Sequence, residues 1–206
     1  MMMLAVETTA AVASAALLKD GVLLAEREAD AGKKHAETLL PLIDALLEEN
    51  GVTIKQIDLF AVDVGPGSFT GVRIGVSLVN ALAFAAGKKV VAVDSLETLA
   101  LTAGETSRPV AAMIDARNGN AYAALYQAGS TLIEPCAVQT ESFIAKLPQD
   151  VILVGDVQAE PKTYPRAKHV GGAALRHMER ATDEADPIYL RPSQAERTKE
   201  KSGREA

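Results

Sequence analysis

The sequence predicts an α/β fold around a sheet with parallel strands, and three observations support this. The 206 residues are 48% hydrophobic, which is enough apolar material for a core. Tryptophan is absent and aromatic residues make up 4%, so the core must consist of aliphatic side chains, as in helices packed on β-branched strands. Finally, strand and helix patterns alternate at 57–64, 71–86, 89–93 and 95–103, an order typical of parallel neighbours.

The chain begins with a strand meander followed by a helix. Short strands are expected at 2–8, 12–18 and 22–28, and Lys19-Asp20-Gly21 is a hairpin turn signal. Helix formers dominate from His35 to Asn50, Gly51 is a suitable residue just beyond the helix end, and Pro41 is expected to kink the helix or end its first turn.

A second unit begins after the polar stretch 104–108. Strands are expected at 109–115, 120–127, 131–138 and 151–154, with helices at 140–147 and 173–182. We therefore divide the chain into an N-terminal subdomain, 1–106, and a smaller C-terminal one, 107–192. The tail, 193–206, has almost no apolar residues and is predicted to be disordered.

Charge and cysteine content exclude several classes of protein. A net charge of −6 argues against a surface whose main task is to neutralise nucleic-acid phosphates. The single cysteine, Cys136, cannot form an internal disulfide, and the N-terminus lacks a signal-like pattern, so a cytoplasmic protein is expected. A membrane span is not expected because Arg73, Ser77 and Asn80 interrupt the longest apolar run.

The stretch "GPGSFTG", residues 65–71, is a candidate phosphate loop. Gly65, Gly67 and Gly71 allow close backbone approach, and the start of the following helix offers N–H groups to an anion. The spacing matches neither common nucleotide-binding motif, and no lysine is present. The alternative is a tight turn in which Ser68 or Thr70 caps the helix.

The helix that follows this loop has two opposed apolar stripes. Val72, Val76, Val79 and Ala83 form one stripe, and Ile74, Leu78, Ala81 and Ala85 lie nearly opposite. One stripe can cover the chain's own sheet, so the other needs a second partner. We expect a protein–protein interface; the alternative is burial beneath the chain's own second half.

Residues suited to catalysis are sparse. His35, His169 and His177 lack the spacing of a metal site. Of the possible nucleophiles, Ser68 lacks the G-x-S-x-G frame and Cys136 has no base nearby in sequence. Glu7 has no second acid to help it hold Mg²⁺. Two short polar pairs have no assigned role: Asp115 with Arg117, and Tyr189 with Arg191.

Six motifs resemble one known family in order along the chain: "LAVETT", "KKHAETLLPLID", "VGPGSFTGVRIGVS", "VDSLETLA", "IDARNGNAYAALY" and "PIYLRPS". Together they are similar to the bacterial TsaB (YeaZ) family, and "GPGSFTGVRIG" is the most specific of them. The resemblance implies an actin/Hsp70-like ATPase superfamily fold with two RNase H-like subdomains, the C-terminal one reduced.

The resemblance also implies a function without catalysis by this chain. Family members support a TsaD-like catalytic subunit, together with a TsaE-like ATPase, in making threonylcarbamoyladenosine beside the anticodon of tRNAs that read codons beginning with A. ATP and metal are then expected in the partner subunits, with no cofactor here, and tRNA is reached only through the complex. The places of the TsaD metal-binding histidines are taken by Ser95 and Leu99.

The family resemblance places a subunit interface, as a homodimer or with TsaD, on helices 35–49 and 71–86. The expected contact residues are His35, Leu39, Leu42, Ile43, Leu46, Val72, Val76, Val79 and Ala83. The alternative function is a stand-alone ATP-binding phosphotransferase or ATPase that uses residues 65–71 for phosphate and Glu7 for Mg²⁺. A metalloprotease is disfavoured because no set of zinc ligands is evident.

Overall fold

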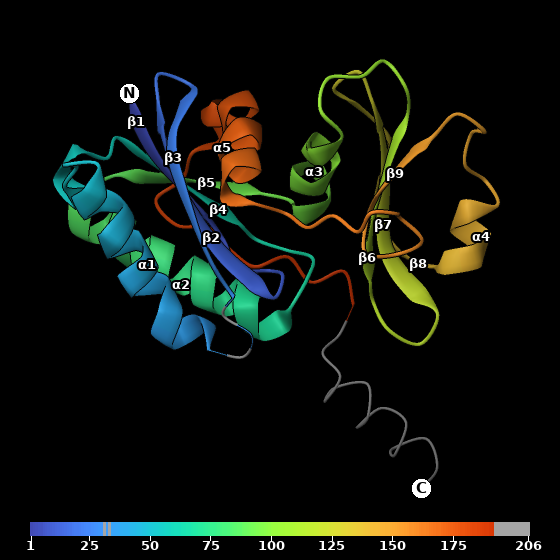
Figure 1. Ribbon diagram of the computed structural model, residues 1–206, viewed down its shortest axis with the longest axis horizontal. Helices are drawn as coiled ribbons and strands as arrows, with labels where there is room; N and C mark the ends of the chain where they lie inside the picture. Colours follow the sequence, from blue (N-terminus) through green and yellow to red (C-terminus); the bar gives the residue numbers. More distant parts are fainter. Residues whose placement is uncertain (31, 33, 192–206) are drawn as a thin grey trace, which may run out of the picture.

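The computed structural model describes residues 1–30, 32 and 34–191, and its two β-sheets lie side by side (Figure 1). The predicted disordered tail, 193–206, lies outside the described residues. Each sheet has helices on both faces, so the predicted α/β class is confirmed.

The first sheet has five strands in the order β3-β2-β1-β4-β5. They are β1 (Met2–Glu7), β2 (Val12–Lys19), β3 (Val22–Asp30), β4 (Leu59–Asp63) and β5 (Lys89–Val93). The first three form the antiparallel meander predicted from the sequence, whereas β4 and β5 run parallel to β1. This is the strand order of an RNase H-like subdomain, and it brings the ends of β1 and β4 together.

Helices cover both faces of this sheet (Figure 1). On one face, α1 (His35–Glu49) and α2 (Phe69–Ala86) pack against each other and enclose the larger core with Leu4, Val6 and Phe60. On the other face lies α5 (Ala167–Arg176), whose small side chains pack on alternate residues of the same strands. The short 3-10 helix η1 (Ile54–Gln56) leads into β4.

The second sheet is smaller, with the order β8-β7-β6-β9. Its strands are β6 (Val110–Asp115), β7 (Asn120–Gln127), β8 (Ser130–Gln139) and β9 (Ile152–Gly155). One face packs against α3 (Ser95–Ala100), which η2 (Leu101–Ala103) extends, and the other packs against α4 (Thr140–Ile144). The last short helix, η3 (Met178–Arg180), follows α5.

The last helix and the domain boundary differ from the sequence prediction. The helix spans 167–176 instead of 173–182, and it belongs to the first sheet. Gly171 lies where an added Cβ would be 2.4 Å from Leu18 Cδ1, so the glycine that weakens the helical pattern in the sequence allows close approach to β2. Farther on, Ile188 N–H donates to Val64 O at 2.8 Å. Residues 107–192 are therefore not one subdomain, because the chain returns to the first unit.

Helix α2 is long and apolar enough to cross a membrane by length and composition, with a mean hydropathy of 1.5 over 18 residues. In the structure, however, its inner face is a wall of the larger core, packed on β4. This packing is that of a core helix of a globular domain, and α2 is unusual only in having an apolar outer face as well.

Candidate functional site

The glycine loop fixes the start of α2. Ser68 caps the helix, because its Oγ accepts a hydrogen bond from Gly71 N at 3.2 Å. Ser68 N in turn donates to Thr9 O at 2.9 Å, and Gly65 N donates to Asp63 Oδ1 at 2.9 Å. These loop donors are therefore already bonded within the chain.

The glycines allow the helix to pack closely on the turn after β1. A Cβ added to Gly71 would lie 2.0 Å from Thr8 O, and one added to Gly75 would lie 2.2 Å from Thr8 Oγ1. At Gly67 the added atom would lie 2.7 Å from Thr9 Cβ. Because real side chains do not make such contacts, the glycines are required by packing, which favours the tight-turn alternative over the phosphate loop.

Glu7 has a second acid beside it, so the prediction that it stands alone was wrong. β1 and β4 are parallel, with Val6 opposite Val62, and this register places Asp63 next to Glu7. Both carboxyl groups are fully buried. Glu7 Oε1 accepts from Thr9 Oγ1 at 2.7 Å and from Ala10 N at 3.1 Å, whereas Asp63 Oδ1 accepts from Gly65 N and from the Ser95 hydroxyl.

The remaining oxygens, Glu7 Oε2 and Asp63 Oδ2, have no other partner among the described residues, so one proton between them completes the pair. Burial raises the pKa of Glu7, and burial together with the Glu7 charge holds the pKa of Asp63 well above its usual range. The described residues contain no cluster of three or more metal-ligating side chains.

The two positions that the family resemblance singled out on α3 are both buried. Ser95 donates to Asp63, as above, and Leu99 packs with Val110 and Val154 in the core between α3 and the second sheet. These residues therefore support the sheets from inside.

A cleft of about 690 Å³ lies between the two units. It brings together both polar pairs that the sequence analysis left without a role: Asp115, Arg117, Tyr189 and Arg191. Of the proposed phosphate loop, Gly67 and Ser68 line this cleft; Glu7, Gly65, Thr70 and Gly71 do not. Arg117 makes an ion pair with Asp115 at 3.4 Å.

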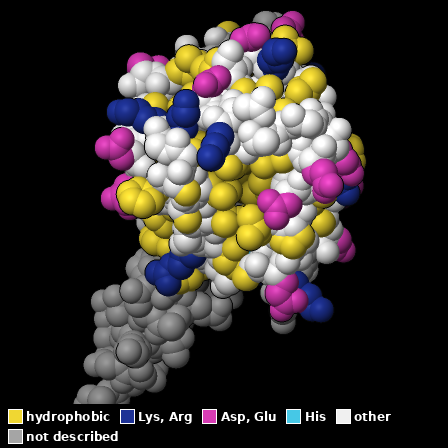
Figure 2. All heavy atoms as spheres, turned by 90° about the vertical axis from the view of Figure 1, so that its left-hand side faces the viewer, with side chains coloured by type: hydrophobic (Ala, Val, Ile, Leu, Met, Phe, Trp, Pro, Cys, Tyr) yellow, Lys and Arg dark blue, Asp and Glu magenta, His cyan; other side chains and the backbone are white. Residues whose placement is uncertain are grey.

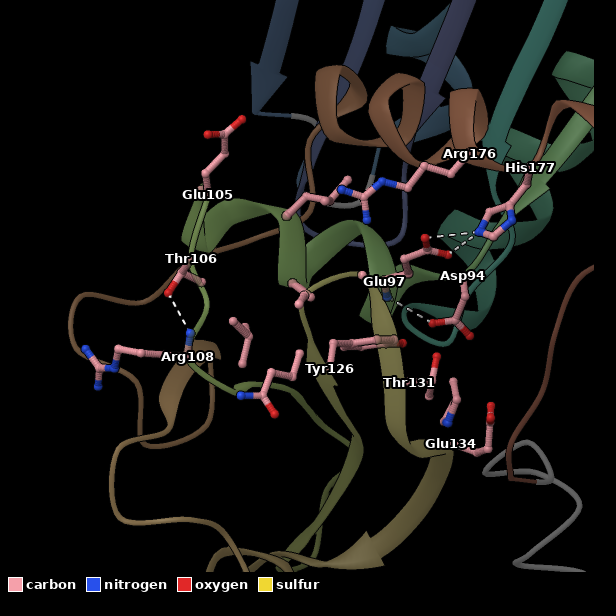
Figure 3. Close-up of a pocket in the computed structure, with 18 of the residues that line it drawn as sticks. Asp94, Glu97, Glu105, Thr106, Arg108, Tyr126, Thr131, Glu134, Arg176 and His177 are labelled. Atoms are coloured by element: carbon pink, nitrogen blue, oxygen red, sulfur yellow. Dashed lines mark hydrogen bonds and ion pairs between the residues drawn. The ribbon is translucent and has the colours of Figure 1, made fainter.

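A second cavity of about 710 Å³ was not anticipated from the sequence (Figure 3). Asp94 caps α3 and faces this cavity, and burial raises its pKa to about 6. Burial and the nearby charges of Asp94, Glu97 and Glu134 also raise the pKa of Tyr126. Among the residues that line this cavity, His177 Nε2 is 2.8 Å from Glu97 Oε2, which ties the end of α5 to α3 (Figure 3). These residues come from four separate elements, so no sequence motif identifies them.

The other histidines and the cysteine are held by the fold. His35 is buried, with Nε2 at 3.0 Å from Ala10 O. His169 is flanked by Arg166 and Lys168, and burial, aided by these two positive charges, lowers its pKa to about 4. Burial also raises the pKa of Cys136, and such a thiol is a weak nucleophile.

The nine expected interface residues are core residues, which corrects that prediction. Their exposed fractions run from 0 to 7% because the chain's own sheet and neighbouring helices cover them. The residues are His35, Leu39, Leu42, Ile43, Leu46, Val72, Val76, Val79 and Ala83. They therefore offer no surface to a second chain.

The opposite stripe of α2 is the one that lies at the surface. Ala81 and Ala85 are exposed, Ile74 and Leu78 are half-buried, and Phe84 is 87% exposed. On α1, Leu40 is 42% exposed beside an exposed Pro41. Figure 2 shows the left-hand side of the view in Figure 1, where the C-terminal ends of α1 and α2 lie. Hydrophobic side chains gather on this side, and charged side chains surround them. We call these seven residues the outer α1/α2 face.

Comparisons with known proteins agree with this architecture. The family model described as "TsaD: tRNA N6-adenosine threonylcarbamoyltransferase" matches residues 28–180. A Bacillus subtilis protein named "tRNA threonylcarbamoyladenosine biosynthesis protein TsaB" is 35% identical over 134 residues, which are 65% of this chain and 58% of the relative. An Escherichia coli protein with the same name is 37% identical over 129 residues, 62% of this chain and 55% of the relative. The matches thus span little more than half the length of these curated relatives.

Among solved structures, one from Pseudomonas aeruginosa is described as an uncharacterized protein with similarity to peptidase YEAZ. It superposes with a TM-score of 0.82 at 30% identity, covering 92% of this chain and 99% of that one. A second, described as YeaZ from Pseudomonas aeruginosa, gives a TM-score of 0.75 at 29% identity, with the same coverage. Because the family model covers most of the chain and the first structure is matched over nearly its whole length, the chain belongs to the TsaD-like family and, within it, to the TsaB (YeaZ) proteins.

Proposed function

We propose that this chain is a non-catalytic partner subunit that supports a TsaD-like catalytic subunit in threonylcarbamoylation of the adenosine beside the anticodon. The names of its relatives motivate this role. The structural observation that carries it is the outer α1/α2 face: an apolar surface on two adjacent helices whose inner sides already form the core.

Such a face is costly to leave in water. Fully burying one large aliphatic or aromatic side chain stabilises a complex by about 1.5–3 kcal/mol. Ile74, Leu78, Phe84 and Leu40 all present apolar surface within this face. A partner that covers them with its own apolar helices would thus gain several kcal/mol, and it could hold an active conformation that the free subunit populates poorly.

The chemistry belongs to the partners in this proposal. The close packing of Gly67 and Gly71 on the turn after β1, with Gly65 N and Ser68 N bonded within the chain, favours ATP and metal in the TsaD-like and TsaE-like subunits, with no cofactor in this chain. The net charge of −6 favours contact with tRNA only through the complex. We place the complex in the cytoplasm and expect the isolated chain to form a homodimer through the same face.

Co-purification with the TsaD-like subunit of the same organism tests this role. Phe84→Asp and Ala81→Asp, at exposed positions, are expected to abolish the complex while leaving the unfolding transition of the isolated chain unchanged. Leu132→Asp is the matched control, because Leu132 is 51% exposed on β8, in the other unit. If the complex survives charges at positions 81 and 84, the outer α1/α2 face is not the interface.

The alternative, a stand-alone ATP-dependent enzyme, has one observation in its favour. The cleft between the units carries Arg117 and Arg191, which are suitable groups for phosphates. Calorimetry of the isolated chain with ATP and Mg²⁺ separates the two functions. Micromolar binding with turnover by this chain alone would support the enzyme, and the absence of both would support the partner subunit.

A further inference from the structure

Arg73 is the one charged side chain in the sequence of α2, and it is exposed near the helix start, one turn from Ser77 and close to Ile74 of the outer face. It makes no ion pair within the described part of the chain. A lone guanidinium beside an apolar surface is the arrangement expected of a specificity contact, since arginine and aromatic residues are enriched at the energetic centres of interfaces.

The guanidinium of Arg73 is held in one orientation. Its Nε donates to Tyr189 Oη at 2.8 Å, and its Cζ lies 3.9 Å from the centroid of the Phe69 ring. The Phe69 and Tyr189 rings are 4.8 Å apart at their centroids, so the arginine rests against an aromatic pair. Because Nε already donates to Tyr189, the two Nη groups remain to donate to an acceptor on another molecule.

Tyr189 is itself fixed by the segment that carries it. Residues 185–191, which we call the C-terminal strap, run along α2 and past the mouth of the cleft. Asn80 Nδ2 donates to Ala185 O, and Ala185 N donates to Asn80 Oδ1, both at 2.9 Å. Ile188 N donates to Val64 O at 2.8 Å, and at the far end Arg191 Nη1 donates to Ala116 O of the second unit at 3.1 Å.

We propose that Arg73 is a pre-oriented anchor that binds an aspartate or glutamate carboxylate of the docked TsaD-like subunit. This inference rests on the proposed function and names one chemical feature that the partner's surface must carry. The strap and the aromatic pair are the positioning elements of the anchor: they hold the guanidinium through Nε and through its contact with the Phe69 ring, and they leave the two Nη groups for the partner.

The chemistry favours a carboxylate on a protein partner. Two parallel N–H groups match the two oxygens of a carboxylate, and such bidentate pairs add both energy and orientation. Restraining the arginine beforehand lowers the side-chain entropy lost on binding. The apolar residues adjoining Arg73 on α2 indicate a folded partner that covers them at the same time, which a free small anion would not do. The acids nearest to Tyr189 in sequence, Asp186 and Glu184, form no ion pair with Arg73.

The test measures affinity for the TsaD-like subunit of the same organism by calorimetry. Arg73→Gln is expected to raise Kd by about tenfold or more. Arg73→Lys is expected to raise Kd by less, because lysine keeps the positive charge but cannot donate two parallel hydrogen bonds to a carboxylate. Tyr189→Phe keeps the ring and removes the bond to Nε, so it should weaken binding in the same direction. Arg180→Gln is the matched control, since Arg180 is exposed on η3, beyond α5.

A structural role alone would give a different pattern. In that case Arg73→Gln would lower the free energy of unfolding and leave Kd within twofold of wild type, which overturns the anchor. If an arginine in place of one carboxylate on the partner restores the affinity lost in Arg73→Glu, that carboxylate is the one that binds Arg73. If no acidic position on the partner's docking surface restores the affinity in this way, the anchor is also overturned.

Two further outcomes separate the inference from the function on which it rests. If Phe84→Asp abolishes the complex while Arg73→Gln leaves its affinity unchanged, the proposed function stands and the anchor fails. If the wild-type chain forms no complex, both fail. If only self-association depends on Arg73, the occupant is a second copy of this chain and the assignment to a TsaD-like subunit is wrong.

Discussion

Gly71→Ala tests whether the glycine loop is there for packing. The added Cβ would lie 2.0 Å from Thr8 O, where ordinary contacts begin at 3.4 Å, so the backbone must move by more than an ångström. Overpacking of this kind costs about 3 kcal/mol, and the better helix propensity of alanine returns about 1 kcal/mol. We therefore expect a net loss of about 2 kcal/mol, which lowers Tm by roughly 4–8 °C in a chain of this size.

Gly172→Ala is the matched control for this substitution. Gly172 also lies inside a helix, but its added Cβ would be 3.6 Å from Leu101 Cδ1, an ordinary contact. The same replacement should therefore stabilise the protein by about 0.5–1 kcal/mol. Urea unfolding followed by circular dichroism measures both variants. If Gly71→Ala is as stable as wild type, the backbone around Thr8 can move without cost to accept the added Cβ, and close packing does not require the glycine.

Three further predictions concern burial and protonation. Val79 is fully buried, so Val79→Ala should lower the free energy of unfolding by about 2 kcal/mol. Phe84 is exposed on the other side of the same helix, so Phe84→Ala should stay within about 0.5 kcal/mol of wild type. Equal losses in urea unfolding would mean that α2 is oriented differently. Asp63→Asn should increase stability at pH 8. The folded-state pKa of Asp63 is raised, so the stability that Asp63 contributes is fully present below its unfolded-state pKa and is lost as pH rises through its folded-state pKa. The side-chain amide introduced by Asp63→Asn would donate to Glu7 in the same way and does not titrate. A stability–pH curve no flatter than that of wild type would contradict the shared proton. Burial raises the pKa of Asp94 from 3.8 to about 6, so the wild-type protein should lose roughly 3 kcal/mol of stability as pH rises from about 4 through 6. Asp94→Asn should remove this loss. If the slope of unfolding free energy against pH between pH 4 and 7 is the same in the variant, Asp94 is not its source.

Much of the fold was predictable because local patterns determine it. The hairpin at Lys19-Asp20-Gly21 and the strands at 89–93 and 120–127 lie where the sequence placed them. The final helix was misplaced by several residues. Its glycine pair weakens the helical pattern, and the reason for Gly171 is contact with Leu18, more than 150 positions earlier in the chain.

The candidate site was less predictable because its members meet only in three dimensions. Glu7 and Asp63 are far apart in sequence and adjoin because β1 and β4 pair in parallel register. A signal was present, since each acid ends a buried strand, but the sequence does not say which strands are neighbours. The cavity around Asp94 and Tyr126 depends likewise on the placement of two sheets and α5.

The sequence by itself determined that α2 has two apolar stripes, because a period of 3.6 residues places Val72, Val76 and Val79 opposite Ile74 and Leu78. Only the tertiary structure decided which stripe is inside. A helix that is apolar on both sides can turn either one toward its sheet, and the close contact of Gly71 and Gly75 with Thr8 selects the orientation with Val79 in the core and Phe84 in solvent. The direction in which an apolar surface faces is a property of packing between distant segments, and local sequence does not encode it.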